Sequence, residues 1–293
     1  MIIDIIVPHY KEDTKTLLTA LSSIDNQVGY SSLIQITVVT DKGGLNIDKD
    51  LIKKSLKSSI QFITTDKHLG PGYARQYAMD RTLGDYIMFC DSDDMLASPF
   101  VFKFFEDTLK QYPNIEIILT GYLEENLIKG KFKYEHKDDD ISIVCLHGKL
   151  YNRSFIYKHN ITFPNLMCSE DGVFNFKCVC HAKNAYFNDD VDTYIYKYNP
   201  NSITRKDTSF INSAANIRAF AETINAFEAF FKEIIENKAS QINTKIIKPF
   251  INSLDTQLNM LSTIPNLTSD NLKELNNSEK RLNTLKETFK KYL

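Results

Sequence analysis

Short apolar runs alternate with amphipathic segments along the first part of the chain. The runs predict strands at residues 2–7, 34–39, 60–63 and 86–89. Between them, apolar residues recur at helical spacing. Asp13 and Pro71 stand where helices are expected to begin, and Gly84 where the second of these is expected to end. This alternation is typical of an α/β fold, in which helices cover both faces of a mostly parallel sheet.

The pattern becomes mixed after Pro99. We expect a helix over residues 100–112 and a further strand over 115–120. The charged stretch 124–140 predicts a hairpin or a loop over the sheet. These elements would complete the same α/β domain.

The character of the sequence changes again near Lys206. Apolar residues now recur at helical spacing, and four phenylalanines share that pattern: Phe220, Phe227, Phe230 and Phe231. We expect them to form a core or a dimer contact rather than a lipid anchor. The chain is therefore divided into an α/β domain, residues 1–206, and a helical C-terminal region, residues 207–293.

The composition is that of a globular protein, since 43% of the 293 residues are hydrophobic and 12% are aromatic. A formal net charge of -2 argues against a protein whose main partner is nucleic acid. No apolar run approaches the roughly 20 residues that span a bilayer, and Met1 enters a predicted strand without a basic leader. We therefore expect a cytoplasmic protein.

The cysteines are scattered, which suits reduced, buried thiols better than a disulfide framework. They are Cys90, Cys145, Cys168, Cys178 and Cys180. Cys178, Cys180 and His181 lie close together and could suggest a metal site. No second spaced pair completes four ligands, so core packing is the stronger expectation.

Three carboxylates follow the strand at 86–89: Asp91, Asp93 and Asp94, with Ser92 among them. Ligands of open α/β sheets bind at the carboxyl ends of the strands. Crowded carboxylates repel one another, and a divalent cation that holds a diphosphate would relieve this repulsion. An isolated cluster of this kind is equally well explained as a solvated acidic turn.

Other candidate residues follow the first two predicted strands. Pro8 fixes a turn, Tyr10 offers a flat face to a base, and Glu12 offers an acceptor for hydroxyl groups. Asp41 ends the second strand and could accept from a base or from a ribose. Each of these residues, taken singly, could equally be an ordinary surface or turn residue.

A third candidate segment follows the strand at 60–63. Gly70 and Pro71 form a turn into a helix that carries Arg75. The segment is a poor dinucleotide fingerprint, and no P-loop motif occurs in the chain. Because the carboxyl ends of successive parallel strands share one sheet edge, all these candidates together predict a nucleotide-diphosphate site with a metal.

The chain resembles the family-2 glycosyltransferases of the GT-A fold over roughly residues 1–206. The matching stretches are 5–12, 70–75, 84–94, 147–153 and 168–174. The resemblance implies a GT-A, Rossmann-like domain and an inverting enzyme with a DxD motif, which moves a sugar from a nucleotide-sugar donor, expected to be a UDP-sugar, to a hydroxyl group.

The resemblance also implies roles for individual residues. The nucleoside would be held by Pro8, Tyr10, Glu12 and Asp41, and the diphosphate or sugar by the turn with Gly70 and Arg75. Asp91, next to Ser92, would reach the ribose or donor sugar, and Asp93 would bind Mn²⁺ or Mg²⁺. Asp171, with Glu170 beside it, matches the motif whose aspartate is the catalytic base. Without the resemblance, Asp171 would be interpreted as a helix N-cap.

The late part of the match departs from the pattern. Many family members carry a histidine in the segment that aligns with residues 196–202, and this chain has none there. A third protein ligand for the metal is therefore in doubt. Ser202 and Arg205 match a region that often closes over the diphosphate.

The expected partners follow from the resemblance and from charge. They are a nucleotide sugar and a glycan or other hydroxyl acceptor, such as a polysaccharide or a teichoic acid, with no nucleic acid. Residues 238–293 carry nine basic and five acidic side chains. This surface could make peripheral contact with the inner face of a membrane or form a homo-oligomer, although a solvated face packed on the first domain is the stronger expectation.

Two alternative functions remain open. A nucleotidyltransferase that makes sugar nucleotides uses a metal and a similar sheet, but it usually has a glycine-rich, lysine-bearing loop after the first strand. A non-catalytic binding or assembly module would use the helical region and leave the site inactive. The donor sugar, the acceptor and the linkage are beyond what a fold can predict.

Overall fold

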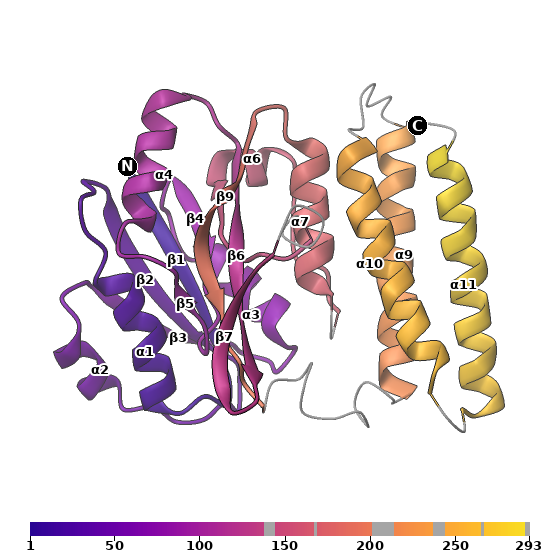
Figure 1. The fold of residues 1–293 in the computed structure, drawn as a ribbon, viewed down its shortest axis with the longest axis horizontal. Coiled ribbons are helices and arrows are strands. Elements are labelled where there is room, and N and C mark those ends of the chain that lie inside the picture. Colours follow the sequence, from indigo (N-terminus) through magenta and orange to yellow (C-terminus); the bar gives the residue numbers. More distant parts are fainter. Residues whose placement is uncertain (138–143, 167–168, 201–213, 237–243, 265–266, 291–293) are drawn as a thin grey trace.

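The computed structural model describes residues 1–137, 144–166, 169–200, 214–236, 244–264 and 267–290. Figure 1 shows a central sheet with helices packed against it and, beside one of those helices, a layer of three long C-terminal helices. The boundary predicted near Lys206 lies outside the described residues, as do Ser202, Arg205 and Cys168.

The four predicted strands form one half of the sheet. They are β1 (Ile2–His9), β2 (Leu33–Thr40), β3 (Ile60–Thr64) and β4 (Tyr86–Phe89). They run parallel in the order β3-β2-β1-β4. The parallel sheet predicted from the alternating pattern is thus confirmed, and the carboxyl ends of these strands meet at one edge.

The other half of the sheet is mixed. It contains β5 (Met95–Leu96), β6 (Ile117–Ile128), β7 (Lys131–Lys137), β8 (Lys149–Asn152) and β9 (Ala185–Tyr196). The strands β8, β6, β9 and β5 continue the sheet beyond β4. β6 and β7 form the expected hairpin, and β6 runs further than the strand predicted at 115–120.

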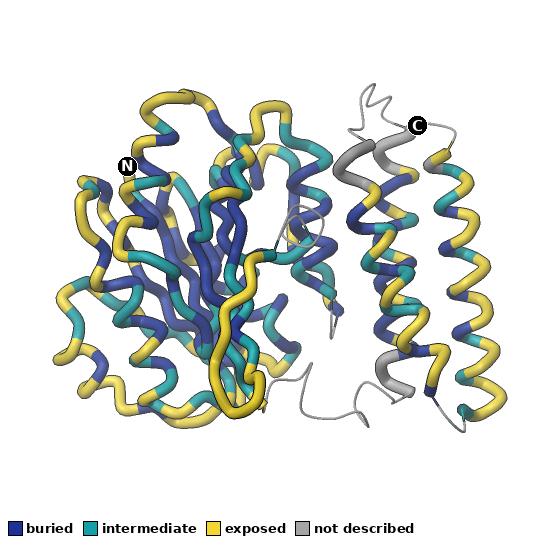
Figure 2. The backbone as a smooth tube through the Cα atoms, in the orientation of Figure 1, coloured by how far each residue is buried: buried dark blue, intermediate teal, exposed yellow. Residues whose placement is uncertain are grey.

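Helices cover both faces of the sheet, as expected. They are α1 (Thr14–Asp25), α2 (Lys49–Ser55), α3 (Pro71–Met79), α4 (Val101–Gln111), α6 (Arg153–Lys158) and α7 (Glu170–His181). Asp13 caps α1 and accepts from the Thr16 amide at 2.7 Å. α1 and α4 bury their apolar residues in one core and α3, α6 and α7 in another, and Figure 2 shows the strands between them as the buried centre of the domain.

The C-terminal helices are α9 (Ala214–Glu236), α10 (Thr244–Ser262) and α11 (Ser269–Lys290). Together with Val173 and Phe176 of α7 they form a third core, which contains all four of the phenylalanines from Phe220 to Phe231. The core prediction for these rings is confirmed. Cys178 is also packed in a core, so the packing interpretation holds for it. No described helix is long and apolar enough to cross a membrane.

A buried ion pair joins the start of β1 to α6. The guanidinium of Arg153 donates to Asp4 Oδ2 at 2.6 Å and to the Gly84 carbonyl at 2.6 Å. Asp4 Oδ2 also accepts from the Gly84 amide at 2.6 Å. A Cβ atom at Gly84 would lie 2.7 Å from Asp4 Cγ, so this close approach requires a glycine before β4.

We predict that Gly84→Ala lowers the free energy of unfolding by about 2–3 kcal/mol, because the new methyl group overpacks a buried site and pushes Asp4 away from Arg153. Urea unfolding measures the change. Gly172→Ala is the matched control, since a Cβ there meets its nearest neighbour at an ordinary 3.6 Å. Equal stability of the two variants would contradict the close-packing argument.

Candidate active site

The loops after β1 and β4 meet through hydrogen bonds between predicted site residues. Ser92 Oγ donates to Glu12 Oε2 at 2.9 Å. The same oxygen accepts from the amides of Tyr10 and Lys11 at 3.1 and 3.2 Å. Glu12 therefore shapes its own loop and holds it to the acidic turn that follows β4.

Asp41 lies buried at the end of β2, where its carboxylate meets four donors. Oδ1 accepts from the Lys42 amide and from Thr65 Oγ1, at 3.0 and 2.8 Å. Oδ2 is 2.7 Å from His68 Nδ1 and accepts from the Gly70 amide at 3.0 Å. Asp41 thus ties the loops after β2 and β3 together, and its contact with a nucleoside stays a prediction.

The ring of Tyr10 stacks on the imidazole of His68, with centroids 4.6 Å apart and an interplanar angle of 18°. The half-exposed side chain of His68 is held in place by Asp41. The sequence assigned no role to His68. Its contact with Tyr10 joins the ends of β1 and β3, which are far apart in sequence, so no local pattern indicates it. The pair forms a flat surface of the kind on which a base can stack.

Arg75 on α3 is buried and joins two carboxylates from distant parts of the chain. Its Nη1 donates to Glu170 Oε1 at 2.8 Å and its Nη2 to Asp91 Oδ1 at 2.6 Å. Among the described residues, Arg75 Nε is a buried donor with no acceptor. Arg75 therefore connects the acidic turn after β4 with the first turn of α7.

The first turn of α7 carries Glu170 and Asp171. Ser169, with φ of 60°, is the N-cap residue, so the interpretation of Asp171 as an N-cap is wrong. Asp171 Oδ1 accepts from the Gly172 amide at 2.8 Å. A Cβ atom at Gly72 of α3 would lie 2.6 Å from Glu170 Cγ, so a glycine there allows α3 and α7 to approach closely.

The charges around Arg75 do not balance, because one guanidinium faces three carboxylates. Burial alone would lower the pKa of Arg75, but Asp91, Glu170 and Asp171 raise it above its usual value. Burial opposes ionisation of Asp91, yet Arg75 and His147 hold the pKa of Asp91 below its usual range. Burial and Asp171 raise the pKa of Glu170 to about 7, although Arg75 opposes the shift.

Asp93 and Asp94 point to different partners. Asp93 Oδ2 accepts from the Asn199 side chain at 2.7 Å, and burial, with Asp91 and Glu12 nearby, raises the pKa of Asp93. Asp94 is buried and accepts from the Tyr194 hydroxyl and the Lys197 amide, at 2.7 and 2.8 Å. Asp94, to which the sequence assigned no role, thus anchors the end of β9.

His147 begins the matching stretch 147–153, and the sequence indicates no individual role for it. In the structure it lies beside the acidic turn. Its ligating nitrogen, with carboxylate oxygens of Asp91 and Asp94, falls in a cluster whose atoms are within 4.8 Å of one another. Burial would lower the pKa of His147, but Cys145, Asp94 and Asp91 raise it to about 9. The protonated imidazole is a counter-charge for these carboxylates, and the neutral imidazole can ligate a cation beside them. His147 Nδ1 is buried and has no hydrogen-bond partner among the described residues.

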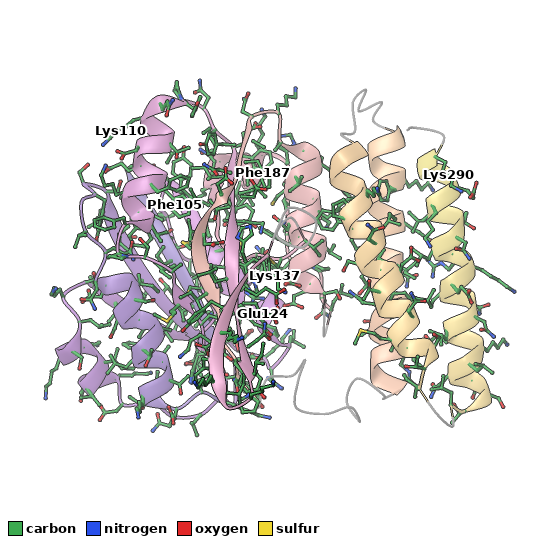
Figure 3. The ribbon with its side chains drawn as sticks, in the orientation of Figure 1. Phe105, Lys110, Glu124, Lys137, Phe187 and Lys290 are labelled. Atoms are coloured by element: carbon green, nitrogen blue, oxygen red, sulfur yellow. The ribbon has the colours of Figure 1, made fainter. Side chains whose placement is uncertain are left out.

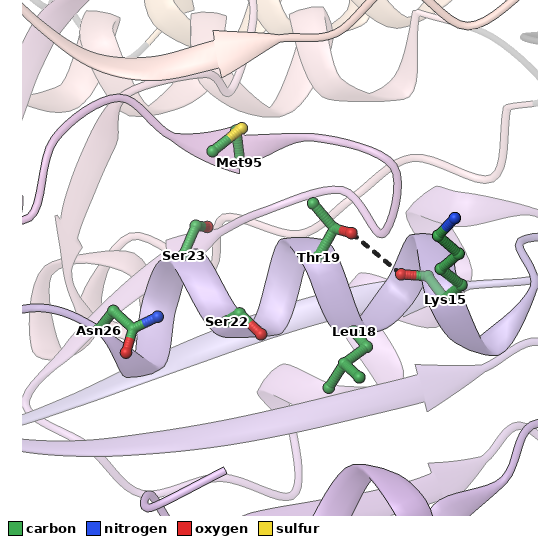
Figure 4. A pocket seen from close by; sticks show the side chains of 7 residues that line it. All are labelled: Lys15, Leu18, Thr19, Ser22, Ser23, Asn26 and Met95. Atoms are coloured by element: carbon green, nitrogen blue, oxygen red, sulfur yellow. Dashed lines mark hydrogen bonds between the residues drawn. The ribbon is translucent and has the colours of Figure 1, made fainter. Parts of the chain in front are cut away.

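One surface hollow lies elsewhere and shares no residue with the predicted site. Its volume is about 440 Å³, and Figure 4 shows its lining, which comes from α1 and from Met95. Thr19 within it donates to the Lys15 carbonyl at 3.0 Å. The hollow is lined by no carboxylate that could hold a metal or serve as a base, so the strand-end loops are the candidate active site.

A parallel half-sheet with carboxylates gathered at the carboxyl ends of its strands, and helices on both faces, defines a protein of the GT-A class. The model for the family described as Glycosyl transferase family 2 matches residues 4–159, more than half of the chain. The chain belongs to this family, as the sequence motifs predicted.

Relatives and solved structures agree with that assignment. The chain is 28% identical over 204 residues to a poly(ribitol-phosphate) beta-glucosyltransferase of Bacillus spizizenii, a match that spans 66% of this chain and only 32% of that protein. The structure is similar to S. aureus TarS 1-349, with a TM-score of 0.68 and 16% identity over 96% of this chain and 80% of that one.

A mannosyltransferase, PcManGT from Pyrobaculum calidifontis, solved in complex with GDP-Man and Mn2+, has a TM-score of 0.58 and 11% identity over 95% of this chain and 79% of its own. At such identities the likeness to TarS and PcManGT shows the GT-A fold alone. The predicted fold class is thereby confirmed, whereas the roles of the individual site residues stay predictions.

We predict that Arg75→Met lowers the free energy of unfolding by about 3–5 kcal/mol, because it leaves Asp91 and Glu170 without their shared counter-charge. Urea unfolding checks the value. Arg81→Met is the control, since Arg81 follows the same helix but lies exposed and bonds a backbone carbonyl. If Arg75→Met is no more destabilising than Arg81→Met, the bridge does not hold the site together.

Proposed function

We propose that this chain is a metal-dependent, inverting glycosyltransferase that moves a sugar from a UDP-sugar to a hydroxyl group of an anionic cell-surface polymer of the teichoic acid type. One observation carries the proposal: Asp91, expected to contact the donor, and the helix turn with Asp171, expected to be the base, are held on either side of Arg75. The two turns that carry the carboxylates expected to act in transfer are thus joined through one guanidinium, which supports the proposal.

The donor class is supported by the loops after β1, β2 and β3. The Tyr10–His68 stack provides a platform for the base, and Glu12 shapes the loop beside it. Pro8 lies within β1, opposite Val39, and not in a turn as the sequence predicted. A related fold, that of S. aureus TarS 1-349, has been solved in complex with UDP-GlcNAc, with a TM-score of 0.59 and 16% identity. We therefore take UDP as the nucleotide.

The acceptor class rests on the relative that acts on poly(ribitol-phosphate). The match spans about a third of that protein. The acceptor oxygen would enter on the side of α7, because the base must lie away from the cation that would otherwise depress its basicity.

The residues at the acidic turn fit a divalent cation. Asp93 is a carboxylate in a site with excess negative charge, and hard cations take oxygen ligands. We assign Asp93 to Mn²⁺ or Mg²⁺, since Asp94 already serves two protein donors. When bound, such a cation stabilises the negative charge that builds up on the leaving diphosphate.

Inversion follows from a single displacement. The Asp171 carboxylate takes the proton of the acceptor hydroxyl while that oxygen forms a bond to the anomeric carbon. The bond from this carbon to the diphosphate breaks on the opposite face, and the electron pair leaves with UDP. Arg75 and Glu170 hold the base-bearing turn against the donor side during this step.

We predict that Asp171→Asn lowers kcat by about 10²–10⁴-fold, because the amide cannot accept the proton, while UDP binding is unchanged. Single-turnover assays and calorimetric titration with UDP measure the two quantities. Asp190→Asn is the control, since Asp190 is an exposed carboxylate outside the site. Near-normal turnover by Asp171→Asn would remove this residue from the mechanism.

We predict that Asp93→Ala abolishes the rise in melting temperature that UDP causes in the presence of Mn²⁺, because a ligand stabilises the native state only where it binds. Thermal unfolding with UDP, with and without Mn²⁺, measures this. Asp94→Asn is the contrast: it can still accept from Tyr194 and should retain the Mn²⁺-dependent shift. If the Mn²⁺-dependent rise in melting temperature is lost in Asp94→Asn and kept in Asp93→Ala, the metal ligand is Asp94 and not Asp93.

The two alternative functions have distinct outcomes. A glycosyltransferase releases UDP from a UDP-sugar, whereas a nucleotidyltransferase forms or consumes pyrophosphate. A non-catalytic module binds UDP and releases nothing. The loop Pro8-His9-Tyr10 lacks glycine and is not the glycine-rich, lysine-bearing loop of a nucleotidyltransferase, which favours the transferase.

A further inference from the structure

The end of the β6–β7 hairpin is a two-stranded ribbon that extends beyond the sheet. β6 pairs with β9 as far as Glu124, and within the described residues Glu125–Ile128 pair only with β7. Lys137 forms ion pairs with Glu124 and Glu135 at the base of the ribbon, and Figure 3 shows Glu124 and Lys137 there. Figure 2 shows the ribbon as an exposed strip.

Large apolar side chains gather at the tip of this ribbon. Their exposed fractions are 45% for Leu127, 45% for Ile128, 58% for Phe132 and 54% for Tyr134. Leu127 lies opposite Phe132 in the pairing register, so these two side chains share one face with Tyr134. Ile128 lies opposite Lys131 on the other face of the ribbon. An isolated two-stranded hairpin is marginal in water, and an exposed apolar cluster on one indicates a contact surface.

The tip is also basic. Lys129, Lys131 and Lys133 are exposed, and among the described residues none of them has a carboxylate within ion-pair distance. No acidic residue occurs from Asn126 to Tyr134. Lysines alone on an edge strand would be explained as protection against edge-to-edge pairing, but that explanation does not cover the apolar side chains beside them.

We propose that the hairpin tip, residues 127–134, docks the protein on an anionic lipid surface. Apolar and aromatic side chains with interleaved lysines are the combination that binds the headgroup region, where the rings and aliphatic groups enter and the ammonium groups meet the lipid phosphates. An anionic glycan would match the lysines but would leave Leu127 and Ile128 without a role.

The base of the ribbon is connected to the candidate active site. Glu125 accepts from the Tyr134 hydroxyl at 2.9 Å and from the Tyr198 amide at 3.1 Å. The next residue, Asn199, donates to Asp93. The ribbon that carries the docking tip is therefore linked to the acidic turn through Tyr198 and Asn199, although the proposal does not depend on the transfer activity.

Sedimentation of the full chain with vesicles tests the proposal. We expect binding to phosphatidylcholine vesicles that contain phosphatidylglycerol, weakened by salt, and little binding to pure phosphatidylcholine. Lys131→Gln with Lys133→Gln should weaken partitioning about 25-fold, since each lysine near an anionic surface contributes about a fivefold factor. Leu127→Thr with Ile128→Thr should also weaken it and keeps strand-forming residues in place.

Matched controls come from other exposed surfaces. Leu83→Thr removes a leucine that is 89% exposed, and Lys273→Gln with Lys280→Gln removes two exposed lysines of α11. Both should bind vesicles as the unmodified chain does. UDP titration without vesicles should be unchanged in every variant, which separates lipid docking from donor binding and from misfolding.

Several outcomes would overturn the proposal. They are failure of the unmodified chain to bind anionic vesicles, equal binding by the hairpin variants, and dependence on the α11 lysines in place of those at the tip. Retention on an immobilised polyphosphate polymer, with no binding to vesicles, would also reject the lipid surface and assign the tip to an anionic polymer.

Discussion

The buried bridge formed by Arg75 is the interaction on which the candidate active site depends. The terminal nitrogens of Arg75, Nη1 and Nη2, donate to carboxylates at the start of α7 and in the turn after β4. Glycine at position 72 lets α3 and α7 approach closely enough for the bridge to form. A buried guanidinium cannot lose its proton, so Arg75 stays charged at any pH at which the fold persists. Its partner Glu170, whose pKa is raised to about 7, can take up a proton.

The surroundings of the same bridge support the proposal that the site holds a cation. Arg75 and His147 do not neutralise all the carboxylates that surround them, and the pKa values of Asp93 and Glu170 are raised as a result of burial and neighbouring charge. A divalent cation would offset this negative charge and would also hold the diphosphate of the donor. The protein keeps an unbalanced site within a stable fold because other buried charges, such as Asp4 and Arg153, are paired.

The C-terminal helices have a structural role that the sequence pattern alone left open. Their apolar faces form one core with Val173 and Phe176 of α7. These residues follow Glu170 and Asp171 on the same helix, so the bundle supports the element that carries the expected base. The hairpin supports the other side, since Glu125 holds the segment from which Asn199 reaches Asp93.

The sequence by itself determined the parallel half of the sheet, the helix that Asp13 caps, the family and the set of candidate residues, because these depend on local periodicity and on short motifs. Only the tertiary structure decided which of those residues meet. Arg75 and Glu170 are 95 residues apart, and no local pattern encodes their contact. The separate orientations of Asp93 and Asp94, and the place of His147 beside them, depend on side-chain direction and on packing between distant segments.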